Sequence, residues 1–378
     1  MRITEPKILF LVSEDWYFWS HRLPVARAAR DAGFRVVVAT CVNRHGDMIR
    51  KEGFKLIPIR LRRTSQNPFH DLQFILDLVR IYRRERPNVV HHVALKPVLY
   101  GLWASKITGV PGTVNAMAGL GSVFVSRSLK AAMLRNVIRM LYRVVHGSKN
   151  TRMIFQNPDD IVTFWGAGGA ERRDVVLIKG SGVDMSVYSP LPEPEETPLV
   201  VFASRMLWDK GVGEYVKAAQ RIHDAGIRAR FALVGESDSQ NPTEVPPAQL
   251  EAWQNSGVVE WWGRCDDMPA VFARSHIVCL PSAYGEGIPK VLIEAAACGR
   301  AVVTTDAPGC REIVRHLDNG LLVPVGNVSK LADALRQLIT DPEMRKRMGG
   351  RGREIAVAEF SEERVVRQTL AVYRELLH

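Results

Sequence analysis

The chain has 378 residues, of which 46% are apolar and 24% are charged. This ordinary globular composition excludes a disordered, collagenous or disulfide-stapled protein, and the length predicts two domains of about 150–200 residues each. The net charge of +11 is unevenly distributed: residues 1–190 hold 29 Lys and Arg against 14 Asp and Glu, whereas residues 191–378 hold 22 against 26. We therefore expect the cationic first half to face something anionic.

Short apolar runs alternate with helix-like segments along the chain, which is typical of repeated βαβ units. In the first half we predict strands at 7–12, 35–40, 56–59, 89–93, 114–115 and 152–156, with helices at 21–32, 71–84 and 98–108. In the second half we predict strands at 199–203, 231–234, 258–262, 277–280 and 301–304, with helices between them. The predicted fold class is α/β, with two tandem doubly wound Rossmann-like domains and a ligand site in the cleft between them.

A Pro-rich segment marks the expected domain boundary. Residues 189–198 contain four prolines and three acids, so they can form neither a helix nor a central strand. We predict an N-terminal domain over 1–185, a linker over 186–198 and a C-terminal domain over 199–360. The last helix, within 361–378, is expected to pack back toward the N-terminal domain.

The cysteines and apolar runs bear on the location of the protein. Five cysteines form no Cys-x-x-Cys pair, which predicts reduced core thiols in a cytosolic protein. The first apolar run, residues 8–12, is too short for a signal peptide, and no stretch approaches the roughly 20 apolar residues of a membrane-spanning helix. We expect a protein that does not cross a bilayer.

The most informative segment reads LPSAYGEGIPKVLIEAAACG and ends at Gly299. A turn holds Glu286, and a helix is expected to begin around Pro289. A helix N-terminus entered through glycine exposes N–H groups that suit a phosphate, and Glu294 on an apolar helix is costly unless a polar partner uses it. These carboxylates could meet a transferred sugar and a ribose. The alternative is a capping Glu286 and a Glu294 paired to a neighbouring arginine.

A second motif, SRMLWDKG, follows the first strand of the second half at residues 204–211. Arg205 and Lys210 fall in the loop at the carboxyl end of that strand, where α/β sheets bind ligands. The Arg fork and the Lys point charge suit a diphosphate whose negative charge grows as it leaves. The alternative is a solvated surface loop.

With these motifs, the second half resembles the nucleotide-sugar domain of group 1 retaining glycosyltransferases, which have two Rossmann-like domains (the GT-B fold). Further matching segments are LVGES at 233–237, the long stretch 263–314, NGLLVPVGN at 319–327 and FSEERVVRQTLAVYRELL near the C-terminus. The resemblance implies that Glu286 contacts the donor sugar and Glu294 the ribose. It also implies that Arg205 and Lys210 bind the diphosphate, and that the loop around Arg264 holds the base.

Additional donor contacts are expected from Gly235, Gly287, Ile288, Lys290 and Val291. The family usually has a glycine three residues after the first Glu, where this chain has Pro289. Proline lacks the N–H that would reach a phosphate, so Lys290 could take over that contact.

The first half resembles a narrower branch, the bacterial transferases that extend sugars on undecaprenyl diphosphate. The matching segments are SEDWYFWSHR at 13–22, HHVALKP at 91–97 and NAMAGLGSVF at 115–124. The resemblance implies that His91 or His92 touches the donor sugar, although a hydrogen-bonded structural role is the alternative for either. Lys96 is a candidate for the carrier diphosphate or the leaving group. Acceptor or phosphate contacts are expected from Ser13, His21, Arg22, Asn115, Gly119, Leu120 and Gly121.

A basic amphipathic helix is predicted over 128–148. Arg135, Arg139 and Arg143 share one side and apolar residues the other, which favours a cationic stripe facing an anionic membrane. The alternative is a core helix with a solvated arginine face. The membrane interpretation is strengthened by the exposed-looking aromatics at residues 16–19.

The leading hypothesis is a metal-independent, retaining glycosyltransferase without cofactors. It would move a hexose or N-acetylhexosamine from a nucleotide sugar, with UDP favoured, to a polyprenyl-diphosphate-linked saccharide in surface-glycan biosynthesis. We expect it in the cytoplasm, on the inner face of the bacterial plasma membrane. A soluble acceptor, or a nucleotide-sugar epimerase or phosphorylase, are alternatives on the same fold. A non-enzymatic, basic nucleic-acid-binding module is a further alternative, but no motif supports it. A dehydrogenase is disfavoured because no GxGxxG follows the first strand of either domain.

Overall fold

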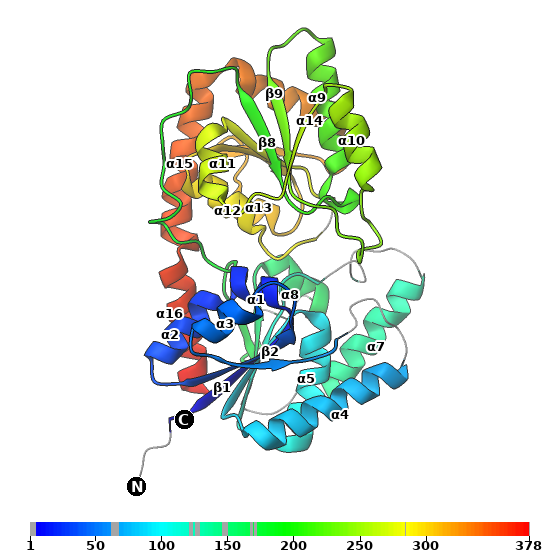
Figure 1. The fold of residues 1–378 in the computed structure, drawn as a ribbon, viewed down its shortest axis with the longest axis vertical. Coiled ribbons are helices and arrows are strands. Elements are labelled where there is room, and N and C mark those ends of the chain that lie inside the picture. The colour runs from blue at the N-terminus through cyan, green and yellow to red at the C-terminus, as the bar shows by residue number, and fades with distance from the viewer. Residues whose placement is uncertain are drawn as a thin grey trace. The chain divides into compact units, whose positions relative to one another are not determined.

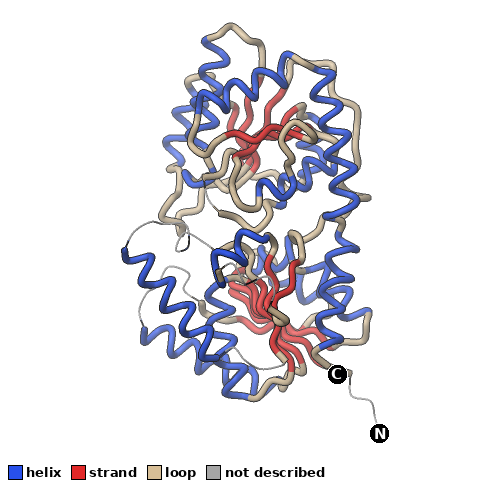
Figure 2. Tube along the Cα trace, turned by 180° about the vertical axis from the view of Figure 1, so that it is seen from behind, coloured by secondary structure: helices blue, strands red, loops and turns tan. Residues whose placement is uncertain are grey.

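A computed structural model describes residues 5–61, 68–120, 124, 129–145, 150–166, 169, 172–283 and 285–377. These residues form two compact units (Figure 1), one of Met1–Gly182 with Glu362–His378 and one of Val183–Ser361. Each unit is built on an all-parallel sheet with helices on both faces (Figure 2). The predicted fold class of two Rossmann-like α/β domains is therefore confirmed.

The first unit holds a seven-stranded sheet of order β3-β2-β1-β4-β5-β6-β7. Its strands are β1 (Lys7–Glu14), β2 (Arg35–Cys41), β3 (Lys55–Pro58), β4 (Val89–Val93), β5 (Gly112–Ala116), β6 (Thr151–Phe155) and β7 (Val175–Leu177). The central strands are continuous apolar runs because helices cover both of their faces. The strand order reverses between β1 and β4, which pair in parallel.

Two helix layers cover this first sheet. On one face α4 (Pro68–Glu85) and α7 (Leu129–Val145) both pack against α5 (Leu95–Thr108). The other elements of the unit are α1 (Asp15–His21), α2 (Leu23–Asp31), α3 (Gly46–Lys51), α8 (Pro158–Trp165) and α16 (Glu362–Glu375). Helix α16 packs against α2 and β5, so the end of the chain belongs to the first unit.

The second unit holds a six-stranded sheet of order β10-β9-β8-β11-β12-β13. Its strands are β8 (Leu199–Ala203), β9 (Arg230–Val234), β10 (Glu260–Gly263), β11 (Ile277–Leu280), β12 (Ala301–Thr305) and β13 (Gly320–Val323). Its helices are η2 (Trp208–Lys210), α9 (Val212–Asp224), α10 (Pro247–Asn255), α11 (Met268–Arg274), α12 (Lys290–Ala297), α13 (Cys310–Ile313), α14 (Val328–Thr340) and α15 (Pro342–Phe360). Here the strand order reverses between β8 and β11.

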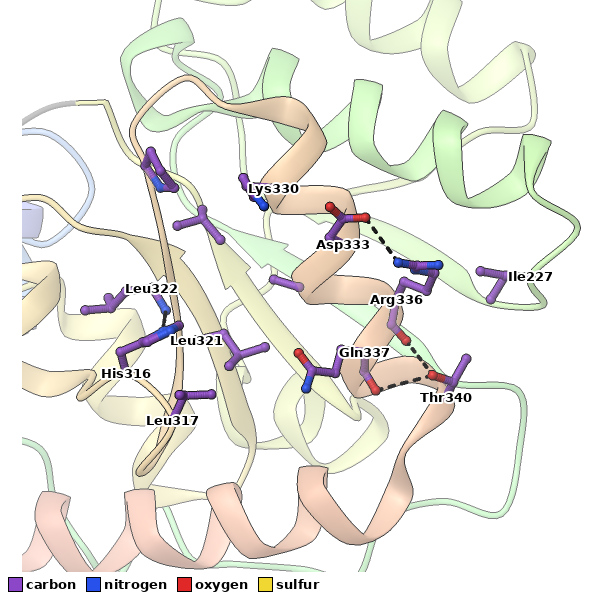
Figure 3. Close-up of a pocket in the computed structure, with 13 residues that line it drawn as sticks. Ile227, His316, Leu317, Leu321, Leu322, Lys330, Asp333, Arg336, Gln337 and Thr340 are labelled. Carbon is purple, nitrogen blue, oxygen red and sulfur yellow. Dashed lines mark hydrogen bonds and ion pairs between the residues drawn. The ribbon is translucent and has the colours of Figure 1, made fainter.

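A cavity of about 840 Å³ lies at the β13 edge of the second sheet, next to α14 (Figure 3). Its lining includes Leu321 and Leu322 from the strand and Lys330, Asp333 and Arg336 from the helix. None of the residues predicted for the functional site lines this cavity, so it is a separate feature of the sheet edge.

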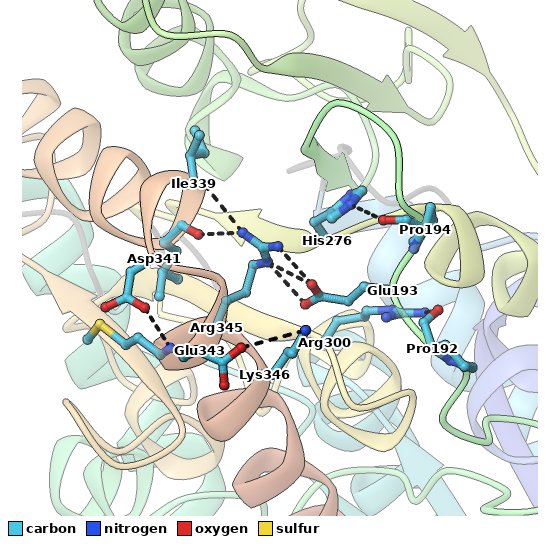
Figure 4. Close-up of polar contacts among 12 residues, drawn as sticks. Pro192, Glu193, Pro194, His276, Arg300, Ile339, Asp341, Glu343, Arg345 and Lys346 are labelled. Carbon is cyan, nitrogen blue, oxygen red and sulfur yellow. Dashed lines mark hydrogen bonds and ion pairs between the residues drawn. The ribbon is translucent and has the colours of Figure 1, made fainter.

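The segment predicted as a linker, residues 186–198, packs on the second unit instead (Figure 4). The Glu193 carboxylate accepts three hydrogen bonds from the Arg345 guanidinium, at 2.8–3.1 Å, and both side chains are almost fully buried. His276 Nε2 lies 3.0 Å from the Pro194 carbonyl oxygen. The prolines exclude a helix, as expected, but they leave backbone carbonyls and acids free to bond to neighbouring elements. The units therefore divide at Gly182 and Ser361, not across 186–198.

The predicted helix over 21–32 corresponds to α2, whereas the short helix α1 before it was not predicted. Helix α1 begins directly after β1, and α2 begins at Leu23 with Pro24 in its first turn. Proline favours the first turn of a helix and disfavours an interior position, so it places the break near Arg22. Among the described residues no helix is both long and apolar enough to cross a bilayer.

Candidate active site

The predicted donor residues of the second unit meet where its strand order reverses. Lys210 ends the short η2 after β8, and Glu286 lies in the loop after β11. Since β8 and β11 are neighbouring parallel strands, their carboxyl ends open onto the same edge of the sheet. Lys210 Nζ lies 2.5 Å from Glu286 Oε2, and each side chain is 14% exposed. Two residues 76 positions apart in the sequence thus form one ion pair at the switch point.

Close contacts hold these two loops together. The Ala283 N–H donates to the Asp209 carbonyl at 2.9 Å, and Ser282 Oγ donates to Glu286 Oε1 at 3.0 Å. Gly309, just before α13, has a φ of +82°, and a Cβ there would lie 1.8 Å from the Gly287 carbonyl oxygen. Sequence reasoning missed Ser282 and Gly309, because only the fold reveals that they pack against the loop that holds Glu286, which we call the glutamate loop.

Glu294 is held by two partners in the second turn of α12. Lys290 Nζ lies 3.3 Å from Glu294 Oε1, one helical turn away, and the Tyr188 hydroxyl also hydrogen-bonds to the carboxylate. Burial raises the pKa of Tyr188, and the negative charge of Glu294 raises it further, so the hydroxyl stays protonated and donates. Tyr188 was missed because it precedes the Pro-rich segment interpreted as a linker. The predicted alternative of an arginine partner is replaced by Lys290 and Tyr188.

The remaining predicted cations lie in neighbouring loops at the same sheet edge. Arg205 Nη1 lies 2.7 Å from Asp238 Oδ2, and Arg264 Nε lies 2.8 Å from Asp266 Oδ1. Gly235 follows β9 with a φ of +143°, and a Cβ there would lie 1.8 Å from the Ser204 carbonyl oxygen. Gly235 therefore permits the loops after β8 and β9 to approach each other.

Two of the predicted donor residues support the start of α12 from within the core. Ile288 is buried, and Val291 is half-buried against the apolar core of the unit. Pro289 caps the helix, and Gly287 approaches Gly309. These residues fix the position of Glu286 and Lys290 on either side of the helix start.

In the first unit, His92 belongs to a buried polar network. Its Nδ1 lies 2.8 Å from Asn115 Oδ1, and its Nε2 lies 2.9 Å from the Tyr82 hydroxyl. Since a carboxamide oxygen only accepts, Nδ1–H donates to Asn115 and Nε2 accepts from Tyr82. Tyr142 on α7 lies beside Asn115. Burial lowers the pKa of His92 to about 4, so the ring is neutral and both nitrogens are used inside the fold.

This network bears on two predicted roles. The His92 ring fills the space over Gly101 of α5, where a Cβ would lie 2.5 Å from the ring. Asn115, predicted as an acceptor contact, is fully buried and bonds to His92 with its carbonyl oxygen. The structural alternative considered for the histidine pair therefore describes His92, and the acceptor role of Asn115 gains no support from its contacts.

His91 points to the opposite face of the sheet and keeps one ring nitrogen available. Its Nδ1 lies 2.5 Å from the Tyr373 hydroxyl of α16, and its ring stacks on Phe10. Its buried Nε2 has no hydrogen-bond partner among the described residues. Burial and the nearby Arg22 charge hold the pKa of His91 well below its usual range. Of the two histidines, only His91 can offer a ring nitrogen to a ligand.

Arg22 is the second group with unused hydrogen-bonding capacity near the β1–β4 reversal. The residue is 5% exposed, and its Nε has no partner among the described residues. No carboxylate pairs with it in the described part of the chain. A buried cation without a counter-charge is costly, so this position suits an anionic ligand.

The other predicted residues of this half have diverse surroundings. Lys96 lies in the first turn of α5, where burial lowers its pKa and the charge of Asp71 opposes that change. The His21 ring stacks on Tyr17 at 4.2 Å between centroids. Ser13 is half-buried near the end of β1, Gly119 has a φ of +101° and Leu120 is buried, whereas Gly121 lies outside the described residues.

The orientation predicted for the basic helix is wrong. Arg139 is half-buried on α7: it donates to the Thr163 carbonyl and lies over the Phe124 ring. Arg135 is also half-buried, and the Arg143 side chain lies outside the described residues. Among the described apolar side chains of α7, Met133, Leu134 and Met140 are instead exposed, at 73%, 41% and 57%. The helix turns this way because Ile138 and Tyr142 are the residues that pack in the core.

The aromatics predicted as exposed near the first strand are likewise packed. Phe18 is fully buried, and Trp16, Tyr17 and Trp19 are half-buried. Among the described residues no group of three or more His, Cys, Asp or Glu side chains is placed to hold a metal ion.

Comparison with known proteins covers both units. Residues 189–355 match the family model "Glycosyl transferases group 1", and residues 7–157 match "Glycosyl transferase 4-like". The N,N'-diacetylbacillosaminyl-diphospho-undecaprenol alpha-1,3-N-acetylgalactosaminyltransferase of Campylobacter jejuni is 27% identical over 384 residues, spanning 98% of this chain and 99% of that protein.

Solved structures share the fold across the full chain. Anabaena HepE in complex with UDP and glucose aligns with a TM-score of 0.77 at 19% identity, covering 98% of this chain and 99% of that one. Sucrose-phosphate synthase from Thermosynechococcus elongatus aligns with a TM-score of 0.79 at 20% identity, with the same coverage.

Proposed function

Because the chain belongs to the group 1 glycosyltransferases, we propose that it transfers a hexose or N-acetylhexosamine from a UDP-sugar to a polyprenyl-diphosphate-linked saccharide, with retention of anomeric configuration. The observation that carries the proposal is the Lys210–Glu286 contact at the strand reversal, with Glu294 in the second turn of α12. The name of the Campylobacter relative, an N-acetylgalactosaminyltransferase acting on a diphospho-undecaprenol, supports the acceptor class. The proposal places the enzyme in surface-glycan biosynthesis at the inner leaflet of the plasma membrane.

On binding, the donor diphosphate would replace Glu286 and Asp238 as the partner of Lys210 and Arg205. Lys210 neutralises Glu286, and Arg205 neutralises Asp238. A diphosphate at this edge attracts both cations, which frees Glu286 to accept hydrogen bonds from the sugar hydroxyls. The Arg fork and the Lys ammonium then stabilise the negative charge that develops on the leaving diphosphate, without a metal ion.

Glu294 would bind the ribose of the same donor. Its carboxylate accepts from Tyr188 and lies beside Lys290, which fixes its orientation before the nucleotide arrives. In the reaction, the bond between the anomeric carbon and the diphosphate oxygen breaks, and the acceptor oxygen bonds to that carbon. In this scheme no residue of the site acts as a nucleophile, and an oxygen of the departing diphosphate accepts the proton of the acceptor hydroxyl.

Arg22 and His91 would serve the acceptor. Arg22 offers a buried charge with no described carboxylate partner, and His91 offers Nε2. Both groups suit the carrier diphosphate or the hydroxyls of its first sugar. Lys96, at the start of α5, is the third candidate for that diphosphate.

The test is a donor panel followed by a transfer assay. The protein is mixed with UDP- and GDP-sugars, and the donor is the one that raises Tm; ligand at about 100 times its Kd adds about 2.7 kcal/mol to stability. The selected donor is then supplied with an undecaprenyl-diphosphate saccharide, and the anomeric configuration of the product is read by NMR. Replacing Glu294 by Gln should remove both donor-induced stabilisation and transfer. Full turnover by that variant would refute the site assignment.

The same assay separates the alternatives. A transferase with a soluble acceptor would use the free saccharide as well as the lipid-linked one. An epimerase would convert the UDP-sugar without any acceptor, and a phosphorylase would require inorganic phosphate. Absence of stabilisation by every nucleotide sugar would refute the proposal as a whole.

A further inference from the structure

Helix α4 exposes an apolar stripe that continues into arginines. Phe69, Leu72 and Leu76 are spaced i, i+3, i+7, so they share one helix face, and they are 81%, 56% and 46% exposed. Arg80 and Arg83 extend the same face by one and two further turns and are also exposed. A helix of an ordinary globular domain buries such leucines, so an exposed apolar stripe of this kind indicates an interaction surface.

Helix α7 adds three exposed apolar side chains to the same helix layer. Met133 and Met140 are 73% and 57% exposed, and Leu134 is 41% exposed. Because α4 and α7 both pack against α5, their outward faces belong to the same side of the first sheet. Figures 1 and 2 show both helices on that side. The α4–α7 surface is defined here by Phe69, Leu72, Leu76, Arg80, Arg83, Met133, Leu134 and Met140.

The charge of this region identifies the kind of partner. Residues 60–150 contain fifteen Lys and Arg but only three Asp and Glu, so their net charge of +12 exceeds the +11 of the whole chain. A groove of about 610 Å³ beside α4 is lined by Arg60, Arg80 and Arg84, together with Asp71 and Asp77. Asp77 pairs with Arg80, so part of this charge is neutralised locally. The surplus remains strongly cationic and favours an anionic surface.

We propose that the α4–α7 surface docks the first unit on an anionic lipid bilayer. In an interfacial helix, apolar side chains enter the acyl region of the bilayer, and neighbouring arginines bind the lipid phosphates. A nucleic acid would use the arginines but would leave six large apolar side chains in water. The docking face is therefore different from the arginine side of α7 that the sequence predicts, and the inference rests on the proposed lipid-linked acceptor.

The position of the stripe agrees with access to that acceptor. Phe69 lies in the first turn of α4, and Lys96 lies in the first turn of α5. Both helices begin at the carboxyl edge of the sheet, since each follows a strand that ends there. The charge of Asp71, two residues after Phe69, acts on Lys96, which places the apolar end of the stripe near the candidate acceptor residues.

Vesicle co-sedimentation of the full chain tests the docking surface. Vesicles of phosphatidylglycerol with phosphatidylethanolamine are compared with vesicles of phosphatidylcholine alone. We expect binding to the anionic vesicles that weakens as salt is raised. Replacing Phe69, Leu72 and Leu76 by Gln should lower the partition coefficient at least 100-fold, because each apolar side chain leaves the interface. The pair Arg80→Gln and Arg83→Gln should lower it about 25-fold, at about fivefold per cation.

A matched control uses exposed apolar residues of the second unit. Leu191, Val325 and Val357 are 55%, 46% and 45% exposed, and their triple Gln variant should bind vesicles as the parent chain does. Equal binding by the α4 triple variant and this control would overturn the proposed surface, as would equal loss in both. Tighter binding to duplex DNA than to anionic vesicles, with the same dependence on Arg80 and Arg83, would assign the surface to nucleic acid and overturn the proposal.

A second readout separates this inference from the proposed function. Donor-induced stabilisation does not involve α4, so the α4 triple variant should retain it unchanged. If the parent chain binds no anionic vesicle yet transfers sugar to a detergent-solubilised acceptor, the docking surface is wrong and the transferase assignment stands. If vesicles bind through α4 but no nucleotide sugar raises Tm, docking holds without the proposed function, and its link to a lipid-linked acceptor fails.

Discussion

Gly309 lies within the matched stretch 263–314 but was not predicted as a site residue. It packs against the loop that holds Glu286, and replacing it by Ala should disable the candidate site. Its φ of +82° is one that side-chain-bearing residues rarely adopt. A Cβ at this position would lie 1.8 Å from the Gly287 carbonyl oxygen and 2.7 Å from that of Glu286. Cys310 and Ile313, which follow in α13, are completely buried, so the glutamate loop is the part that must move.

The size of the effect follows from the displacement. A carbon–oxygen contact needs about 3.3 Å, so the loop must shift by about 1.5 Å. That shift separates Glu286 from Lys210, which are 2.5 Å apart in the parent chain. Because a misplacement of about 1 Å can cost about 100-fold in rate, we expect kcat/KM for the donor to fall about 100-fold. The unusual φ should also cost about 1–2 kcal/mol of stability.

Gly326→Ala is the matched control. Gly326 has a φ of +73° in the same unit, but nothing lies within 4 Å of a Cβ there. It should therefore lower Tm through backbone strain while keeping its activity. Sugar transfer and Tm are measured for both variants with the donor found by the panel. If Gly309→Ala retains kcat/KM within threefold of Gly326→Ala, the supporting role of Gly309 is refuted.

Three further predictions concern single contacts. Tyr188→Phe should raise KM for the donor about tenfold with little change in kcat, because Glu294 loses a hydrogen bond made to a charged group; unchanged steady-state kinetics would contradict this. The pKa of His92, about 4 in the folded chain and about 6.5 unfolded, means that the unfolded chain takes up the proton first as pH falls. About 2 kcal/mol of stability should therefore be lost between pH 7 and pH 5, and denaturant titrations should show that His92→Asn lacks this share of the loss. Since Asp160, whose burial raises its pKa to about 7, acts in the opposite direction in both proteins, the difference between them isolates His92. Gly101→Ala should cost about 1–3 kcal/mol by overpacking against His92, whereas Gly350→Ala, in a helix with nothing within 4 Å, should be neutral or stabilising; equal changes in Tm would contradict the packing argument.

The parallel sheets were predictable because their strands are uninterrupted apolar runs. Strand β8 was predicted at its observed bounds, and the Glu286 and Lys210 loops follow strands that the fold brings side by side. Their pairing was not predictable from spacing, since it depends on the strand order. The same limit applies to Gly309, which is far from Glu286 in the sequence and touches its loop only in the fold.

The facing of α7 was mispredicted for a physical reason. A helical wheel ranks faces by polarity, whereas the core of this unit takes Ile138 and the polar Tyr142, which lies near Asn115. An aromatic ring and a cation can satisfy each other, so Arg139 packs over Phe124 and the methionines remain outside. His91 and His92 likewise lie on opposite faces of β4, and only the fold shows that Tyr373 bonds to the first and Tyr82 to the second.

The two halves of the chain hold their cations in different ways, and this difference connects the charge distribution to the chemistry. In the second unit the cations of the candidate donor site are paired with acids, as Arg205 is with Asp238 and Lys210 with Glu286. Such pairs keep the unliganded site nearly neutral, and a diphosphate need only displace a carboxylate to bind. In the first unit Arg22 is buried without a described acid. The acids of that unit are too few to neutralise its arginines, so the counter-charge must come from outside the chain. Under the proposed function, an acceptor that carries a diphosphate and sits in an anionic leaflet would supply that counter-charge both at Arg22 and along α4.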